Sequence, residues 1–186
     1  VKYEAKTVDP DSKAAKFRHE LKYEISYGEY LLTAARLSTV MRPDKHVGET
    51  GRYRISSLYF DNFYDKALRE KLSGIRVRDK YRIRYYNNDL SYITLEKKSK
   101  RNSLCLKRSC RITQEECRKI LNGDIEWMAA ERDERILLAE LYTMETAGLM
   151  RPKTIITYDR QPFVYRPGNV RVTFDSNIRT GLYHTD

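Results

Sequence analysis

The segment RVRDKYRIRYY, residues 76–86, has a basic residue at every second position from its first residue to its ninth. Successive side chains of a β-strand point to opposite faces, so a strand here carries five cations on one face. Like charges side by side on one face repel each other. The pattern therefore predicts a strand whose basic face binds an anion; the alternative is a face exposed to solvent, which alternating charge also fits. The five cations are Arg76, Arg78, Lys80, Arg82 and Arg84.

The positive charge of the chain is concentrated around this segment. The 186 residues include 36 Lys and Arg against 26 Asp and Glu, a net charge of +10. Residues 76–111 alone contain twelve basic and three acidic side chains. Such a local field favours phosphates, nucleic acid or an anionic membrane surface as partners. Arginine predominates in the row, and its planar fork suits bidentate contacts to phosphate.

Polar and apolar residues alternate along several other segments. Between some of these lie segments whose apolar residues have the spacing of an α-helix. Consecutive strands joined by short turns favour an antiparallel sheet, hence an α+β fold. We expect these strands to close into a tunnel-like barrel with the helices packed outside. The predicted strands are 17–25, 53–61, 76–86, 91–100, 104–112, 153–160, 163–166 and 170–175, and helices are predicted after Ser26, Asn62 and Thr113 and over 125–148.

One domain accounts for most of the chain. We expect residues 1–16 to be flexible and residues 17–186 to form a single domain. The odd count of three cysteines without a CxxC pair gives no disulfide framework or zinc site, which favours a reducing, cytoplasmic location. No apolar run reaches the roughly 20 residues of a membrane span, and no P-loop or GxGxxG motif is present.

Two carboxylates lie among the cations. Glu20 and Glu96 each precede a lysine by two residues and therefore share a strand face with it. A carboxylate beside bound phosphates can hold Mg²⁺ or Mn²⁺. The alternative is a salt bridge that relieves the repulsion among the cations. His19 falls on the apolar side of its predicted strand, which favours packing over catalysis.

Six motifs in order resemble the VTC domain, the polyphosphate polymerase module of the triphosphate tunnel metalloenzyme (CYTH-like) superfamily. They are RHELKY (18–23), SLYFD (57–61), YRIRYY (81–86), LEKKSK (95–100), YDR (158–160) and RVTFD (171–175). The resemblance implies a β-tunnel whose inward cations grip ATP, triphosphate or polyphosphate. It also implies transfer of the γ-phosphate of ATP to a growing polyphosphate chain with Mn²⁺ or Mg²⁺.

The resemblance carries site roles onto this chain residue by residue. It implies catalytic contacts from Arg82, Arg84 and Lys98. It implies substrate contacts from Lys22, Arg78, Lys80, Lys100, Lys107, Tyr158, Arg160 and Arg171. In the family, the glutamate that holds the metal lies in a strand near the C-terminus. We expect that strand to be missing from this sequence, which ends at Asp186, so Glu20 and Glu96 are the metal-ligand candidates.

Three functions remain open from the sequence. The first is polyphosphate synthesis, the second is hydrolysis of triphosphate or a nucleoside triphosphate, and the third is binding of polyphosphate or phosphorylated ligands without turnover. Nucleic acid is not expected as a partner, because Tyr81 and Tyr85 alternate with the cations and therefore face away from them.

Overall fold

The structure of the protein is a computed structural model that describes residues 17–44, 47–48 and 50–181. The predicted flexible segment 1–16 lies outside the described residues. The elements confirm the α+β class. In chain order they are β1 (Arg18–His19), α1 (Tyr27–Val40), β2 (Arg42–Pro43), β3 (Tyr53–Asp61), α2 (Lys66–Leu72), β4 (Val77–Tyr86), β5 (Asp89–Arg101), β6 (Leu104–Ile112), α3 (Gln114–Leu121), the 3₁₀ helices η1 (Glu126–Ala130) and η2 (Asp133–Arg135), α4 (Ile136–Thr146), β7 (Arg151–Tyr165) and β8 (Val170–Gly181).

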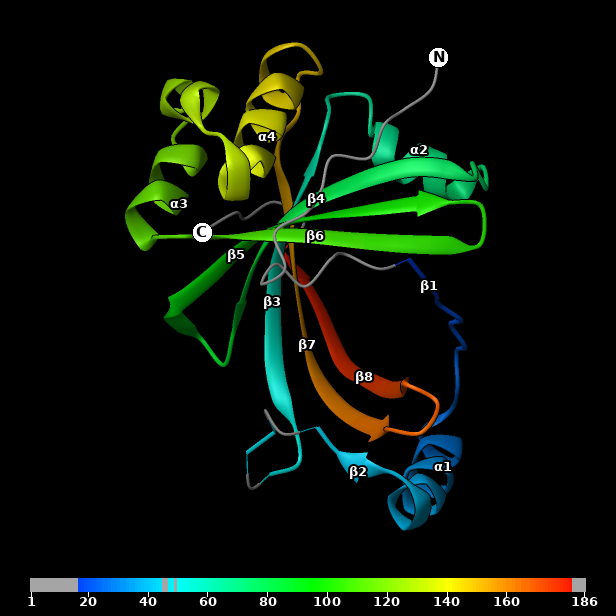
Figure 1. The fold of residues 1–186 in the computed structure, drawn as a ribbon. Coiled ribbons are helices and arrows are strands. Elements are labelled where there is room, and N and C mark those ends of the chain that lie inside the picture. Colours follow the sequence, from blue (N-terminus) through cyan, green and yellow to red (C-terminus); the bar gives the residue numbers. More distant parts are fainter. Residues whose placement is uncertain (1–16, 45–46, 49, 182–186) are drawn as a thin grey trace.

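The strands form one twisted antiparallel sheet in the order β1-β6-β5-β4-β3-β7, with β2 and β8 both paired to β7. Figure 1 shows β4, β5 and β6 running across the view, while β3, β7 and β8 descend from them. A bulge between Tyr59 and Phe60 interrupts the β3–β7 register, and such bulges bend and twist a strand. The sheet therefore curves, and α1 and β1 lie on its concave side (Figure 1).

The predicted closed barrel is wrong for the part of the chain that the structure describes. Closure requires the first and last strands of a sheet to pair, but β8 pairs only with β7 and β1 pairs only with β6. The expected strand 17–25 is reduced to the two residues of β1, and the residues from Glu20 to Ser26 are exposed and belong to no strand or helix. His19 is likewise exposed rather than packed. A two-residue strand offers too few hydrogen bonds to join the two edges.

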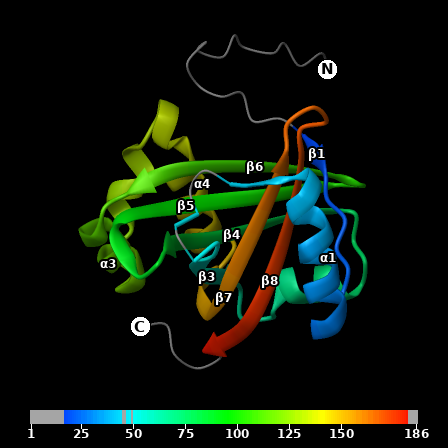
Figure 2. The same cartoon turned by 90° about the horizontal axis from the view of Figure 1, so that it is seen from below.

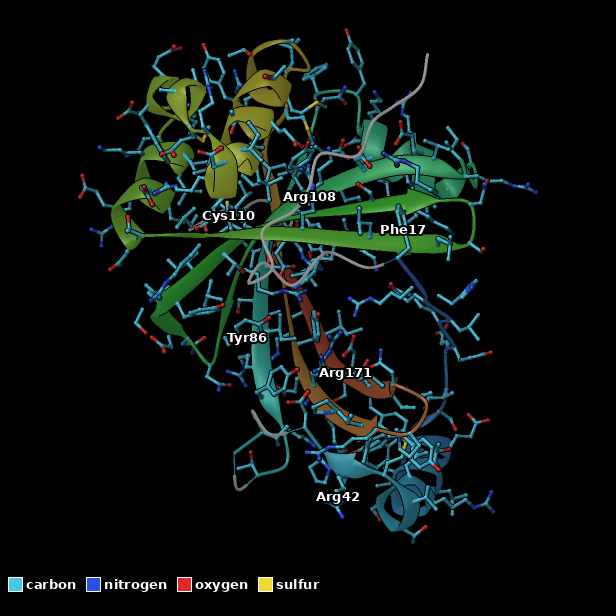
Figure 3. All side chains as sticks on the ribbon, viewed as in Figure 1. Phe17, Arg42, Tyr86, Arg108, Cys110 and Arg171 are labelled. Atoms are coloured by element: carbon cyan, nitrogen blue, oxygen red, sulfur yellow. The ribbon has the colours of Figure 1, made fainter. Side chains whose placement is uncertain are left out.

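The hydrophobic core lies between one face of the sheet and the helices α3, η1 and α4 (Figure 2). Tyr81 and Ile83 of β4 point into this core, as their alternation with the cations predicts. The cations of β4 therefore occupy the opposite side of the sheet, which we call the basic face. In Figure 3, Arg108 and Cys110 lie on the helix side of β6, whereas Arg171 lies on β8.

Local sequence signals fix several element ends. Ser26 with Glu29, and Thr113 with Glu116, form capping boxes at the starts of α1 and α3, the two positions after which helices are predicted. The β4–β5 hairpin turns at Asn87 and Asn88, both at positive φ (50° and 59°), a conformation that asparagine adopts readily. No described helix is long and apolar enough to cross a membrane.

Besides the strand at 17–25, two predicted helices and two predicted strands differ from the structure. The long helix expected over 125–148 is broken, because Glu131 is extended and Asp133 has φ of 50°. The helix expected after Asn62 begins only at Lys66. The side-chain oxygen of Asn62 accepts hydrogen bonds from the backbone amides of Tyr64 and Lys66, and the Asp61 carboxylate accepts one from the amide of Asn62, so a turn precedes the helix. The two strands expected at 153–160 and 163–166 are one continuous strand, β7.

Candidate functional site

Cross-strand register brings the predicted site residues together on the basic face. Lys80, Lys98 and Lys107 stand opposite one another on β4, β5 and β6. The next row along the strands pairs Arg82 with Glu96. Side chains up to 27 residues apart in the sequence thus come into one row across three strands, because two tight antiparallel connections keep the same faces aligned.

Glu96 is the centre of this arrangement. Its side chain is 2 % exposed, and its two oxygens contact three cations. Arg82 Nη2 lies 2.6 Å from Oε2, Lys107 Nζ lies 2.9 Å from Oε1, and Arg84 Nη1 lies 3.8 Å from Oε2. Arg82 also donates to the Tyr59 hydroxyl at 3.0 Å. A buried carboxylate is stabilised only by such pairing, so Glu96 holds the two arginines in fixed positions.

A hydrogen-bonded chain extends from this centre across β3, β7 and β8. Arg84 donates through Nε to Ser57 (3.0 Å) and through Nη2 to the Tyr158 hydroxyl (3.1 Å). Arg160 donates to the same hydroxyl at 3.3 Å and forms a bidentate pair with Asp175 at 2.6 and 2.7 Å. Side chains from five neighbouring strands and β8 therefore form one polar network around Glu96.

The network shifts the acidity of its members. Burial alone raises the pKa of Glu96, but Arg82, Arg84 and Lys107 outweigh that effect and lower it to about 2. Burial likewise acts to raise the pKa of the Tyr59 hydroxyl, yet the adjacent Arg82 brings it below its ordinary value. The Tyr158 hydroxyl has its pKa raised by burial. Glu96 is therefore ionised at neutral pH, and the cations around it dominate the local potential.

The segment after β1 adds a second carboxylate to the same face. Glu20 forms an ion pair with Lys98 and lies 3.5 Å from Lys22 Nζ. Burial raises the pKa of Glu20, and the hydrogen bond and charge of Lys98 reverse this and lower it. Lys22 also helps to lower the pKa of Tyr59. The exposed residues after β1 thus pass over the basic face.

The remaining predicted contacts lie toward the two ends of the basic face. Arg78 stands opposite Lys100, one row beyond the lysine row that includes Lys80. At the other end, Arg171 donates to the Tyr53 hydroxyl at 3.0 Å and pairs with Asp44 at 3.0 Å. The structure therefore brings the central candidates into direct contact and spreads the others along the same face.

The sequence matches the VTC domain family model over residues 17–185. The chain belongs to the VTC domain family. The identification made from the six motifs is thereby confirmed.

Two solved structures that resemble this VTC domain share little sequence with it. A protein of Bacillus halodurans described as a candidate adenylate cyclase is 14% identical with a TM-score of 0.54, and the match covers 87% of this chain and 73% of that one. A candidate adenylyl cyclase of Hippeastrum, described as having a dominant triphosphatase activity, is 13% identical with a TM-score of 0.48, covering 87% and 70%. No curated protein matches.

The described residues of the VTC domain do not by themselves fit a metal centre. They contain no group of three or more His, Cys, Asp or Glu side chains placed to hold an ion. Both oxygens of Glu96 face cations, and Glu20 is shared by two lysines. A divalent ion there would have to displace these partners. The assignment of Glu20 and Glu96 as metal ligands therefore stays a prediction.

Sequence reasoning missed three members of the VTC domain's network: Ser57, Tyr59 and Asp175. The first two alternate with Leu58 and Phe60 on β3, and that alternation was a sufficient signal for their facing the cations. Asp175 shares a strand face with Arg171 and stands opposite Arg160 in the regular β7–β8 register. The predicted break between strands 153–160 and 163–166 hid this pairing, because it separated Arg160 from the strand that turns back into β8.

Proposed function

We propose that this VTC domain binds triphosphate and polyphosphate on the basic face and transfers the γ-phosphate of ATP to the end of a polyphosphate chain. The observation that supports this is the arginine and lysine network around Glu96, in which hydrogen-bond donors from neighbouring strands are already held in position. Cations held in place before a polyanion arrives need no reorganisation when charge develops on a transferring phosphoryl group.

The chemistry asks little of the protein beyond charge and position. The attacking group is the terminal phosphate of the chain, which is already anionic, so no strong general base is needed. Positioning and neutralisation of the phosphoryl oxygens then supply most of the catalysis. We assign Arg82, Arg84 and Lys98 to the transferring phosphoryl group and the other basic-face cations to the rest of the substrate.

Exposure separates the cations into two layers. The side chains of Lys98 and Lys107 are 31% and 37% exposed, whereas those of Arg82 and Arg84 are 15% and 6% exposed. The lysines are therefore the first contacts for an arriving phosphate. The arginines lie beneath them, where lower solvent exposure strengthens each charge–charge interaction.

The deciding experiment incubates the protein with ATP and Mn²⁺ and resolves the products on a gel. Long polyphosphate is the expected product. Orthophosphate release without polymer would identify a hydrolase, and tight binding without turnover would identify a binding module. Preference for duplex DNA over polyphosphate would refute a phosphate-chain site altogether.

Binding to tripolyphosphate tests the assigned residues directly. Lys98→Gln is expected to weaken binding by about 1.5–3 kcal/mol, the range for a charge-assisted hydrogen bond. The matched control is Lys119→Gln, because Lys119 lies on α3 and pairs within that helix with Glu115 at 3.4 Å. Isothermal titration calorimetry on both variants measures the difference; equal affinities for the two would remove Lys98 from the site.

A further inference from the structure

Large apolar side chains are exposed together on and around α2. The helix contacts β3 and β4 but buries only Ala67. We call the exposed group the α2 patch. Its members are Phe63, Tyr64, Leu68, Leu72, Ile75 and Val77. Single exposed apolar residues are ordinary on a protein surface, whereas a contiguous group of them marks a contact with another molecule or with a membrane.

Within the α2 patch, side chains contact or adjoin one another. The rings of Phe63 and Tyr64 pack edge to face, with their centroids 5.4 Å apart. Leu68 and Leu72 are one helical turn apart and therefore share a face of α2. Phe63 and Leu72 are 82% and 75% exposed. Most of this apolar surface therefore contacts water.

Hydrogen bonds hold the backbone at both ends of the α2 patch. Before the helix, the side-chain oxygen of Asn62 accepts from the amides of Tyr64 and Lys66, both at 3.0 Å. After the helix, the amides of Gly74 and Ile75 donate to carbonyls of its last turn at 3.3 and 3.0 Å. This pair of bonds is the Schellman ending of a helix. The exposed side chains are therefore carried by turns of defined conformation.

The segment that forms the α2 patch also carries unneutralised positive charge. Its two acidic residues are paired with lysines, Asp65 with Lys153 at 3.2 Å and Glu70 with Lys66 at 4.0 Å. Three further cations of the segment are exposed and form no ion pair within the described part of the chain. They are Arg69, Lys71 and Arg76. The surface thus combines apolar groups with free cations.

We propose that the α2 patch docks the protein onto a membrane surface that contains anionic phospholipids. Apolar and aromatic side chains beside Lys and Arg bind the boundary between lipid headgroups and acyl chains. The apolar side chains enter this boundary, and the long stems of the three cations keep their charges at the level of the headgroup phosphates. The net charge of +10 attracts the chain to the same surface.

A lipid surface fits this combination better than an apolar protein groove does. A groove that covered only the apolar side chains would leave the three cations without anions, whereas a headgroup layer offers phosphates around every inserted side chain. The proposal does not depend on the proposed function, because no member of the α2 patch belongs to the network around Glu96.

Sedimentation with vesicles of phosphatidylcholine, made with and without phosphatidylserine, tests the apolar part. The apolar variant combines Phe63→Gln with Leu72→Gln and changes no charge. Its matched control is Leu31→Gln with Leu32→Gln, at exposed positions of α1, at the other end of the molecule (Figure 1). We expect the protein to prefer vesicles with phosphatidylserine and the apolar variant to bind them at least about tenfold more weakly. The control should bind as the unmodified protein does.

A second pair of variants tests the cations. The charge variant combines Arg69→Gln with Arg76→Gln. Its control, Arg118→Gln with Lys119→Gln on α3, removes the same charge. We expect binding to phosphatidylserine vesicles to weaken about fivefold for each cation removed from the segment, and less in the control. An equal loss in both would show attraction by net charge alone and would overturn docking through the α2 patch.

Three further results would also overturn the proposal. The first is an unmodified protein that does not sediment with phosphatidylserine vesicles. The second is an apolar variant that binds no more weakly than its α1 control. The third is a dimer in sedimentation velocity that becomes a monomer in the apolar variant and binds no vesicles, which would assign the α2 patch to contact between copies. Circular dichroism confirms that each variant is folded.

Discussion

Replacing Glu96 with glutamine tests the electrostatic centre of the VTC domain. The substitution keeps the shape of the side chain and removes its charge. Arg82, Arg84 and Lys107 then lose the carboxylate that they share, in a place where Glu96 is only 2 % exposed. Removing one partner of a buried pair leaves an uncompensated charge and typically costs about 3–5 kcal/mol.

The pKa of Glu96 gives an independent magnitude. Its value falls from 4.5 to about 2, and each pH unit of difference is worth about 1.36 kcal/mol. Ionised Glu96 therefore contributes roughly 3 kcal/mol of stability at pH 7. Because the folded pKa is the lower one, this contribution is complete above pH 4.5 and is lost as pH falls toward 2. At pH 3.5 roughly 2 kcal/mol of it remains by the same relation.

Urea unfolding at pH 7 and pH 3.5 measures both values. Glu96→Gln should be about 3 kcal/mol less stable than the unmodified protein at pH 7, and the gap should narrow at pH 3.5. The matched control is Glu140→Gln on the helix side, where Glu140 pairs with Lys97 and Arg108 but remains 29% exposed; a cost nearer 1 kcal/mol is expected there. A gap for Glu96→Gln that is the same at both pH values would show that charge is not its source.

Two further substitutions probe other buried polar groups. Glu145 is 1% exposed with Oε1 unbonded, and burial raises its pKa to about 7. The folded protein therefore holds Glu145 protonated more readily than the unfolded chain does, and burial of Glu145 destabilises the protein progressively as pH rises from 4.5 to above 7. Glu145→Met should accordingly stabilise the protein by on the order of 3 kcal/mol at pH 8 and by much less at pH 5. Thermal melts at both pH values check this, and a gain independent of pH would contradict it. Tyr158→Phe removes the hydroxyl that Arg84 and Arg160 share, and should cost about 1–3 kcal/mol in urea unfolding; an unchanged midpoint would show that the arginines find other acceptors.

Period-two alternation predicted the central strands well, because it is a local property of the chain. The expected strands at 53–61 and 104–112 match β3 and β6 residue for residue. The basic face of β4 follows from the same rule. Asp79, which interrupts the apolar side of that strand, pairs across the sheet with Arg101 (2.9 Å) and Lys97 (3.3 Å). That pairing required the β4–β5 register, which only the structure supplies.

Sheet closure was not predictable in the same way, because it depends on pairing between residues far apart in the chain. Alternation over 17–25 resembles a strand, but β1 contains two residues, and Leu21 and Tyr23 are 77% and 80% exposed. An alternating pattern forms a strand only where a neighbouring strand accepts its hydrogen bonds. Arg84 donates to Ser57 and Tyr158 from a buried position in the network, and alternation alone does not indicate that depth.

The repulsion within the row of five cations that begins at Arg76 is offset in one part of the row and not in the other. At Arg82 and Arg84 the buried Glu96 offsets repulsion and fixes both guanidinium groups. At Arg78 and Lys80 no ion pair forms within the described residues, and the repulsion remains. A polyanion that spans both parts would meet preorganised donors in the centre and relieve repulsion at the end. Both effects strengthen binding without any conformational change, and the second requires a ligand long enough to reach past Lys80.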